Sequence, residues 1–595
     1  MVFPSYILRT PIYPFNHFAG KFGNDTLTRE NIKELFANPV FAESIFMASP
    51  PLYYEVEKWI TGKLTHKKAE DRLVFSIVKY LLRMTTRPTP FGLFAGCNVG
   101  SFSNKSEVTL SPVEHFGRHT RLDMNFLCAL SKDVSHHPGI RKKLNYFPNN
   151  SLYPVGNKYR YVEYFYENTK RIHRIVSIDK TEYIDKVLEK CRHGATYSDL
   201  TESIEDAEIS YEDASAFIDE LIHNQVVTSE IEPSTTGVEQ MDHILGILEK
   251  TGETHEITGQ LKTVAGLITD LDHNGSGNAI RKYEEIVNVI KEIGTSFDLK
   301  FLFQTDLMIG TDNNTISTTV QEELKRVIPL LQKLNHKQTQ GNLEKFIKAF
   351  HERYEEREVP LAEALDTELG IGYALRDATA GDINPLVDDL RIPDRKEMQE
   401  YDIQWDALQS FWVKKLVESI DKRLTEVIIT DEEIDKIIPE DREAIKPAAT
   451  FSMMIQVVES DGVNDRCRIL LKSIGGSTGA SLLGRFCHGD PEILALVNDV
   501  TRREDVMAGD AIIAEIVHLP ESRTGNVLLR PAFRRYEIPY LARGSVDSAF
   551  QLTLDDLFLT VRKDQIVIRS KSLNKVILPM HSRFITFFAI SNFRE

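Results

Sequence analysis

Residues 82–96 of this chain read Leu82-Arg83-Met84-Thr85-Thr86-Arg87-Pro88-Thr89-Pro90-Phe91-Gly92-Leu93-Phe94-Ala95-Gly96. Apolar residues recur at three- and four-residue spacing from Glu70 to about Thr86, which predicts a helix leading into this stretch. Pro88 disfavours helical geometry at the residue before it, so we expect the helix to end there. Arg83 and Arg87 lie four residues apart and therefore share one face at the C-terminal end of that helix.

Two guanidinium groups beside the hydroxyl of Thr89 would suit a phosphate or carboxylate ligand, because each presents forked donors. Prolines on both sides of Thr89 fix its backbone, and Gly92 and Gly96 permit another segment to approach closely. The same arginines also complement the negative end of the helix dipole, which is a common and purely structural role. The residues alone leave both interpretations open.

The composition is that of a globular protein, with 42% hydrophobic and 27% charged residues. A length of 595 residues favours several domains or subdomains. We find neither a secretory signal nor the roughly 20 consecutive apolar residues that span a bilayer, so we expect a cytoplasmic protein. The cysteines form no CxxC pair, which favours reduced thiols over a disulfide framework or a metal site. They are Cys97, Cys128, Cys191, Cys467 and Cys487.

The formal net charge of −17 argues against nucleic-acid binding over the whole surface. It leaves room for a local basic cleft, since contact with RNA depends on where the cations lie. Any RNA-dependent function must therefore be confined to such a cleft.

Residues 146–232 predict a small module that resembles a winged helix. Its patterns indicate strands at 151–155, 158–165 and 170–178, helices at 181–192, 197–204 and 211–224, and a closing strand at 226–231. The third helix carries several acidic residues, which argues against DNA binding.

The rest of the chain segregates helices from strands, which predicts the α+β class. The expected helices are three or more segments within 237–293, then 342–356 and 405–423, and the expected strands are 299–308, 450–459, 466–474, 511–519, 526–530 and 560–568. We therefore predict a large mixed α/β domain in two parts, 1–145 and 233–595, into which the module 146–232 is inserted.

The pattern Arg83-x-x-x-Arg87-x-Thr89-Pro90-Phe91-Gly92 closely resembles the signature of the N-terminal domain of lantibiotic (lanthipeptide) dehydratases. Other segments resemble this family in the expected order along nearly the whole chain. They are Arg9-Thr-Pro-Ile-Tyr-Pro, Arg121-Leu-Asp123, Gln304-Thr-Asp306-Leu, Val359-Pro-Leu, Asp366 to Tyr373, Gly484-Arg485-Phe486, Asn526-Val-Leu-Leu-Arg530-Pro531 and Tyr536-Glu537-Ile538. One such motif would be weak evidence, whereas several in order identify a member of the family.

The resemblance implies that glutamate passes from glutamyl-tRNA, a co-substrate, to Ser or Thr hydroxyls of a precursor peptide, with no bound cofactor or metal. Elimination then leaves dehydroalanine or dehydrobutyrine. The ester is needed because hydroxide is a poor leaving group and a carboxylate is a good one. The family implies catalytic roles for Arg83, Arg87, Thr89, Asp123, Asp306 and Arg485, and tRNA or substrate contacts for Arg9, Arg121 and Arg530.

The resemblance leaves the individual roles open. The arginines are expected to hold phosphates of the tRNA acceptor end or the glutamyl carboxylate. Asp123 and Asp306 are expected to position an arginine, the aminoacyl amine or the attacking hydroxyl, and the sequence assigns no general base. Without the family, Asp306 would be interpreted as a solvent-facing strand residue, since Phe301 and Phe303 point to the opposite face.

The glycine-rich loop at 474–486 could present backbone N–H groups to a phosphate through Gly475 and Gly476. It lacks the Gly-Lys-Ser/Thr ending of a P-loop and does not match GxGxxG, so nucleoside triphosphate binding is not expected. A plain connection from a strand to a helix is the alternative.

The module at 146–232 corresponds to the precursor-peptide recognition element of the family. The resemblance implies that a leader peptide adds a strand beside the third strand, near Arg171 to Asp179. Leaders of this class are often acidic, and we expect contacts from Lys170, Arg171, Ile172, Arg174 and Val176. A scaffold without a ligand is the alternative.

The residues after Pro579 depart from the family pattern, and no elimination domain follows them. We therefore expect a glutamylation domain truncated after about residue 579, a separate elimination protein and a cyclase, and, from the family, a homodimer. Two other functions stay open. One is a peptide–aminoacyl-tRNA ligase, which would add an amino acid to a peptide C-terminus. The other is an inactive remnant that only binds leader peptides.

Overall fold

The computed structural model describes residues 2–17, 28–63, 67–167, 170–251, 256–334, 341–373, 405–438, 448–460 and 467–581. Helices and strands lie in largely separate blocks, which confirms the predicted α+β class. Within these ranges, no helix combines the length and the apolar character that a bilayer crossing requires.

The first large sheet joins strands from the N-terminal part of the chain with two strands from its middle. Its order is β3 (Glu107–Leu110), β12 (Thr311–Ser317), β2 (Gly92–Ser103), β11 (Phe303–Met308) and β4 (Gly117–Leu122), and β1 (Ser5–Pro11) also pairs with β2. Strand β11 runs parallel to β2 and antiparallel to β4. Segments about 200 residues apart in sequence are therefore neighbours in one sheet.

Each face of this sheet packs against its own set of helices. One face is covered by α2 (Arg29–Ala37), α3 (Pro39–Ala48), α4 (Pro50–Ile60) and α5 (Lys67–Thr86). Helix α5 ends directly before Arg87, as the proline after it predicts. On the other face, Cys97 and Met308 pack against η3 (Gly484–Phe486) and α19 (Pro491–Ala508).

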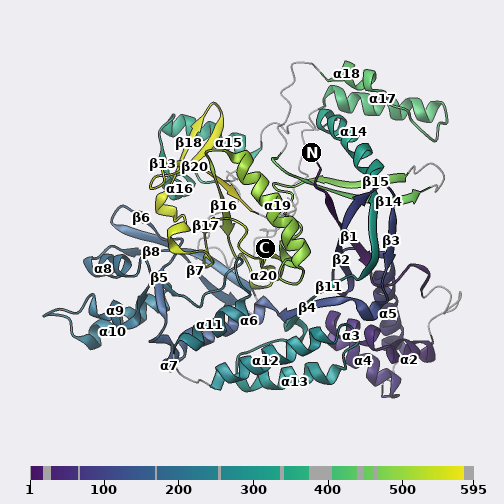
Figure 1. Cartoon of the computed structure of the whole chain (residues 1–595). Coiled ribbons are helices and arrows are strands. Elements are labelled where there is room, and N and C mark those ends of the chain that lie inside the picture. Colours follow the sequence, from purple (N-terminus) through teal and green to yellow (C-terminus); the bar gives the residue numbers. More distant parts are fainter. Residues whose placement is uncertain are drawn as a thin grey trace.

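Helix α19 lies between the first sheet and a second one (Figure 1), and contacts β2 and β16. The order of the second sheet is β13 (Val359–Pro360), β18 (Leu557–Arg562), β19 (Gln565–Ser570), β20 (Lys575–Met580), β16 (Ile512–Val517) and β17 (Tyr536–Pro539). Helices α15 (Asn342–Tyr354) and α16 (Leu361–Leu365) pack against this sheet.

The module contains the predicted elements within a few residues. They are β6 (Tyr153–Val155), β7 (Lys158–Glu167), β8 (Lys170–Asp179), α8 (Glu182–Lys190), α9 (Tyr197–Glu202), α10 (Tyr211–His223) and β10 (Val227–Ser229). Strands β6–β8 form one sheet, whereas β10 pairs with β5 (Asn145–Pro148), which also pairs with β9 (Ala195–Thr196). The winged-helix interpretation and the domain boundaries stay predictions.

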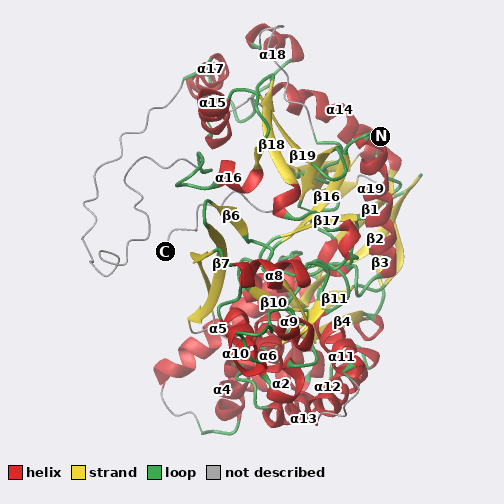
Figure 2. Cartoon of the chain, turned by 90° about the vertical axis from the view of Figure 1, so that its left-hand side faces the viewer, coloured by secondary structure: helices red, strands yellow, loops and turns green. Residues whose placement is uncertain are grey.

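A helical layer underlies the module and the first sheet, and Figure 2 shows it gathered at one end of the molecule. It consists of α6 (Met124–His136), α7 (Pro138–Arg141), α11 (Gln240–Lys250), α12 (Glu256–His273) and α13 (Ile280–Ile293). The last three are the helices predicted within 237–293, with the expected interruption after His273. Their apolar faces share the largest core with the module.

The remaining elements lie mostly at the periphery. They are the helices α14 (Thr318–Leu334), α17 (Ala407–Asp421), α18 (Asp431–Ile437) and α20 (Gly525–Leu528), the hairpin β14 (Ser452–Ser460) and β15 (Cys467–Gly475), and the 3-10 turns η1 (Val113–His115), η2 (Leu299–Phe301), η4 (Ser522–Thr524), η5 (Ser548–Phe550) and η6 (Leu554–Asp556).

Three strand predictions were wrong in part or whole. Residues 526–530 form no strand, because Asn526 to Leu528 lie in the short helix α20. Residues 560–568 are parts of two strands that turn at Lys563 and Asp564, both at positive φ. The strand expected from residue 299 begins at Phe303, after a 3-10 turn.

Candidate active site

The centre of the candidate site is the carboxylate of Asp306, which is 1% exposed and contacts two arginines. Arg485 in η3 donates to Oδ1, and Nη1 of Arg121 in β4 lies 3.1 Å from Oδ2. Burial alone would raise the pKa of Asp306, but the two guanidinium charges outweigh it and lower that pKa. The solvent-facing interpretation of Asp306 was therefore wrong, and its charge is balanced inside the protein.

Arg9 adds a third cation beside this cluster. It lies in β1 opposite Cys97, and within the described residues it forms no ion pair. Burial, together with the charge of Arg485, lowers its pKa. Buried donor nitrogens that lack a partner within the described residues remain on Arg485 (Nε) and Arg121 (Nε). A cluster with spare buried donors and an unpaired cation suits an anionic or oxyanionic ligand.

The motif glycines Gly92 and Gly96 lie where β2 pairs with β11, the strand that carries Asp306. Gly92 adopts a φ of +51° and pairs with Asp306 in the ladder between β2 and β11. A Cβ at Gly96 would lie 2.2 Å from the carbonyl oxygen of Leu307, so β2 reaches β11 only with glycine at that position. The close approach predicted for Gly96 is confirmed. At Gly92 a Cβ would meet no atom within 4 Å, so the close approach predicted there was wrong and glycine is favoured by its positive φ instead.

The motif arginines lie at the end of α5. The guanidinium of Arg83 lies 4.3 Å from the ring centroid of Phe91, and its Nε is buried without a hydrogen-bond partner. Burial and the nearby charge of Arg87 lower the pKa of Arg83. Arg87 and Thr89 are exposed. In the described part of the chain, neither arginine forms an ion pair with Asp306.

Asp123 has a structural role in this structure. Its carboxylate caps α6 by accepting from the backbone N–H of Asn125 at 2.8 Å. Burial raises its pKa despite this bond. Arg121 donates to the backbone carbonyl of Asn526 at 3.0 Å, and Oδ1 of Asn526 accepts from the backbone of Met124. The catalytic role expected for Asp123 stays a prediction.

The expected substrate contact of Arg530 is corrected by the structure. Its side chain is 2% exposed and donates to Glu515 at 2.5 Å and to the carbonyl of Leu528 at 2.7 Å. A Cβ at Gly484 would lie 3.2 Å from the Arg530 side chain. Arg530 packs against the turn that carries Arg485 and therefore supports it. Its donors are bonded inside the protein, so it offers none to a ligand.

Gly475 and Gly476 end β15 with φ values of +144° and +110°. Side chains other than glycine are strained there, and a Cβ at Gly475 would meet no atom within 4 Å. The phosphate-binding role of these glycines stays a prediction.

The residues predicted to contact a leader peptide differ in how exposed they are. In the described residues β8 pairs only with β7, so its outer edge is open to an added strand. Arg174 is exposed and forms an ion pair with Glu163, whereas Ile172 and Val176 are half-buried. The side chain of Lys170 lies outside the described residues.

The leader contact predicted for Arg171 is corrected by the structure. It is 6% exposed, and its Nη1 donates to the backbone carbonyls of Leu519 at 3.1 Å and Leu541 at 3.2 Å. Its guanidinium also lies 3.7 Å from the ring centroid of Tyr164. Arg171 thus attaches the module to the C-terminal part of the chain, because its donors point inward.

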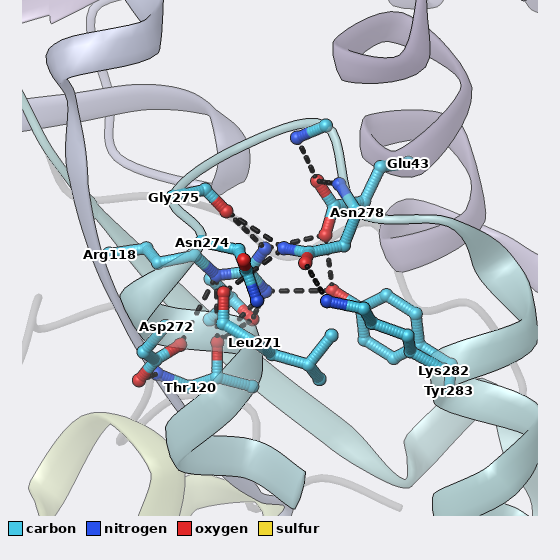
Figure 3. Close-up of polar contacts among 12 residues, drawn as sticks. Glu43, Arg118, Thr120, Leu271, Asp272, Asn274, Gly275, Asn278, Lys282 and Tyr283 are labelled. Carbon is cyan, nitrogen blue, oxygen red and sulfur yellow. Dashed lines mark hydrogen bonds and ion pairs between the residues drawn. The ribbon is translucent and has the colours of Figure 1, made fainter.

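Strand β4 connects the site to a buried polar network on its opposite face (Figure 3). There Arg118 donates to Glu43 at 2.5 Å, and Tyr283 donates to the same carboxylate at 2.6 Å. Asp272 accepts from the backbone N–H of Thr120 at 2.8 Å. Because strand side chains alternate, Arg118 and Thr120 fix β4 while His119 and Arg121 face Asp306.

The sequence analysis missed His119 and its partner Glu239. Nε2 of His119 lies 2.6 Å from Oε1 of Glu239, and His119 is directly opposite Asp306 in the ladder. The two-residue spacing from His119 to Arg121 was a usable signal, since both side chains share a face of a strand. Nothing local indicates Glu239, which is 120 residues away in sequence.

Two curated proteins are similar to this chain over most of its length. The subtilin biosynthesis protein SpaB of Bacillus subtilis is 24% identical over 573 residues, covering 94% of this chain and 52% of that protein. The nisin biosynthesis protein NisB of Lactococcus lactis subsp. lactis is 24% identical over 564 residues, covering 92% of this chain and 53% of that protein. The chain thus spans about half the length of these relatives.

Two solved structures share the fold. The tRNA-dependent lantibiotic dehydratase MibB from Microbispora sp. 107891 superposes with a TM-score of 0.80 at 18% identity, covering 98% of this chain and 55% of that one. The glutamylation domain TbtB from thiomuracin biosynthesis, bound to 5'-phosphodesmethylglutamycin, gives 0.59 at 17% identity, covering 94% and 68%. The sequence model of the family "Lantibiotic dehydratase, N terminus" matches residues 37–591. The chain therefore belongs to the lantibiotic dehydratase family, within its N-terminal region.

Proposed function

We propose that this chain transfers glutamate from glutamyl-tRNA to Ser and Thr side chains of a ribosomally made precursor peptide. The observation that carries the proposal is the buried cluster of Asp306, Arg121 and Arg485, with Arg9 unpaired beside it. Acyl transfer passes through an oxyanion, and fixed cationic donors stabilise that charge where water is excluded. Membership of the family supports the same chemistry.

We assign separate roles to the two groups of arginines. Arg9 and Arg485 hold the glutamyl carboxylate or the oxyanion, since Arg485 pairs with the buried Asp306 and the charge of Arg9 lies near Arg485. Arg83 and Arg87, beside the exposed Thr89, hold phosphates of the tRNA acceptor end. This division places RNA contact on a small basic surface, which reconciles it with the net charge of −17.

The precursor peptide is proposed to add a strand to the open edge of β8. The apolar side chain of Ile175, which is 64% exposed on that strand, and the exposed Arg174 would contact an apolar and acidic leader. We further propose a cytoplasmic setting and a homodimer. We assign the elimination of glutamate and the formation of rings to other polypeptide, outside the residues that match the family model.

The test is an incubation of the chain with candidate precursor, tRNA-Glu, glutamyl-tRNA synthetase, glutamate and ATP, followed by intact mass of the peptide. Glutamyl increments that depend on tRNA, located on Ser or Thr by fragmentation, are the expected result. An increment at the peptide C-terminus would instead make the chain a peptide–aminoacyl-tRNA ligase. No increment together with leader binding would leave a peptide-binding protein and overturn the transferase.

A further inference from the structure

His119 and Asp306 project from the same face of the first sheet, since they are directly opposed in the antiparallel ladder of β4 and β11. Nε2 of His119 is hydrogen-bonded to Glu239 at 2.6 Å. Glu239 precedes α11, and its side chain does not cap that helix. Because an ionised carboxylate only accepts, Nε2 carries the proton in this pair and Nδ1 carries the lone pair.

The second ring nitrogen of His119 is available. Within the described residues Nδ1 forms no hydrogen bond. It is not buried either, so a ligand can reach it. The side chain as a whole is 20% exposed. A carboxylate on one nitrogen and an open lone pair on the other is the arrangement that a histidine base needs.

Other part-buried histidines in the same region are arranged differently. Nε2 of His488 bonds to the backbone carbonyl of Gly237 at 2.8 Å, and Nε2 of His243 bonds to that of Glu230 at 2.8 Å. Burial lowers the pKa of His488 and lowers that of His243 to about 4. Within the described residues neither of these histidines is hydrogen-bonded to a carboxylate, and Nδ1 of His243 lies 3.3 Å from Nη2 of Arg543, so His119 differs from both.

The charges around His119 come from four elements and the loops beside them. Those facing it are Arg121 on β4, Asp306 on β11, Asp272 on α12, Glu239 and Asp242 at the start of α11, and His488 after η3. Burial alone would lower the pKa of His119, but the hydrogen bond and charge of Glu239 raise it.

We propose that His119 is the general base of glutamyl transfer and that Glu239 is the positioning residue that orients its ring. The inference rests on the proposed function and adds a residue to it. Nδ1 takes the proton from the Ser or Thr hydroxyl while Oγ forms a bond to the ester carbonyl carbon of glutamyl-tRNA. The intermediate then breaks its bond to the ribose oxygen, which receives the proton from the imidazolium. The products are a glutamyl ester of the peptide and uncharged tRNA.

The test measures single-turnover transfer from preformed glutamyl-tRNA by the wild-type chain and by His119→Ala, Glu239→Gln and His115→Ala. His115, an exposed histidine in η1, is the matched control. We expect His119→Ala to lose about 100-fold or more in rate, with partial rescue by added imidazole, and His115→Ala to match wild type. Leader-peptide affinity, measured in parallel, reports on the fold and is expected to be unchanged in all variants.

The pH profile separates a base from a structural residue. A base must be neutral, so the rate falls as pH drops through the pKa of His119. Removing the carboxylate in Glu239→Gln lowers that pKa, so the acid limb is expected to move to lower pH. An active wild type with no rate loss in His119→Ala, or an acid limb unmoved in Glu239→Gln, would overturn the inference alone. A wild type that transfers no glutamate would overturn the proposed function and the base together.

Discussion

Arg485 forms an ion pair with Asp306 although 179 residues separate them in the sequence. Arg485 belongs to η3 and Asp306 to β11, so the pair exists only when η3 and α19 pack on the first sheet. Arg121 contacts the other carboxylate oxygen from β4. Assembly of the site is therefore coupled to the packing of three distant segments.

Asp306→Asn is expected to lower glutamyl transfer by about 100-fold, because the two arginines lose the charge that holds them in place. It should also destabilise the fold by about 3–5 kcal/mol, the cost of breaking a buried ion pair. Transfer rates and thermal unfolding of both proteins at pH 7 measure these effects. A variant with wild-type rate would contradict the assigned role.

The stability difference should depend on pH in a defined direction. The folded pKa of Asp306 is lowered, so its contribution is complete above the ordinary value of about 4 and is lost as pH falls through the folded pKa. The gap in unfolding temperature between wild type and Asp306→Asn should therefore be full at pH 5–7 and shrink below about pH 4. An unchanged gap at pH 3 would argue that folding does not lower the pKa of Asp306.

Glu43→Gln is expected to cost about 3–5 kcal/mol of stability, because the buried Arg118 would lose its fully buried counter-charge and keep only the partly exposed Asp272. Glu43 also accepts from the backbone N–H groups of Gly277 and Asn278, so its loss loosens the loop before α13. Chemical denaturation measures the effect. Glu284→Gln, which alters an exposed carboxylate bonded to Tyr54, is the control and should stay within about 0.5 kcal/mol. Equal effects of the two would contradict the assigned role of the network.

The secondary structure of residues 146–232 was predictable because its signals are local. Helix α10 has a cap at Ser210 and an apolar face, and β7 alternates against β8 in an unbroken ladder. The turn at Lys563 and Asp564 was missed although aspartate favours turns, because no glycine, proline or asparagine stands beside it to strengthen the signal. The strand predicted at 526–530 failed because α20 is one turn long, too short to show a period.

The sequence predicted which residues belong to the candidate site, but it did not predict how they contact one another. The motifs named Asp306, Arg485 and Arg121, and the structure brings these three together. No sequence signal distinguished them from Arg530 and Arg171, whose donors bind internal carbonyls. Burial of a charge depends on partners far away in the chain, and a single sequence does not reveal those partners.

Gly96→Ala is expected to disrupt the pairing of β2 with β11, because the added Cβ would meet the carbonyl oxygen of Leu307. The result should be loss of stability together with loss of transfer, since Asp306 precedes Leu307 in the strand. Gly266→Ala is the matched control, because its Cβ meets nothing within 4 Å on the exposed side of α12. That change should stabilise by about 0.5–1 kcal/mol. Thermal unfolding measures both, and a tolerated Gly96→Ala would contradict the close approach.

Ile175→Asp is expected to weaken leader-peptide binding by about tenfold or more, since an exposed apolar anchor on β8 is replaced by a charge that repels an acidic leader. Arg174→Ala should weaken binding by up to about fivefold, and less at high salt. Fluorescence anisotropy with a labelled leader measures both. Leu343→Asp, another exposed apolar position, lies on α15 and should leave affinity unchanged. Wild-type affinity in Ile175→Asp would place the leader elsewhere.

Arg87→Ala is expected to weaken binding of tRNA and to reduce the salt dependence of that binding. A side chain that contacts one phosphate contributes a slope of about 0.7–0.9 in log affinity against log salt, through release of one counterion. Arg87 is exposed and within the described residues has no ion-pair partner to lose, so its removal changes the tRNA contact without altering the fold. Lys348→Ala is the control, because this lysine is also exposed but lies on α15. Filter binding of tRNA from low to moderate salt gives the slopes. An unchanged slope in Arg87→Ala would leave the arginine as a partner of the helix dipole alone.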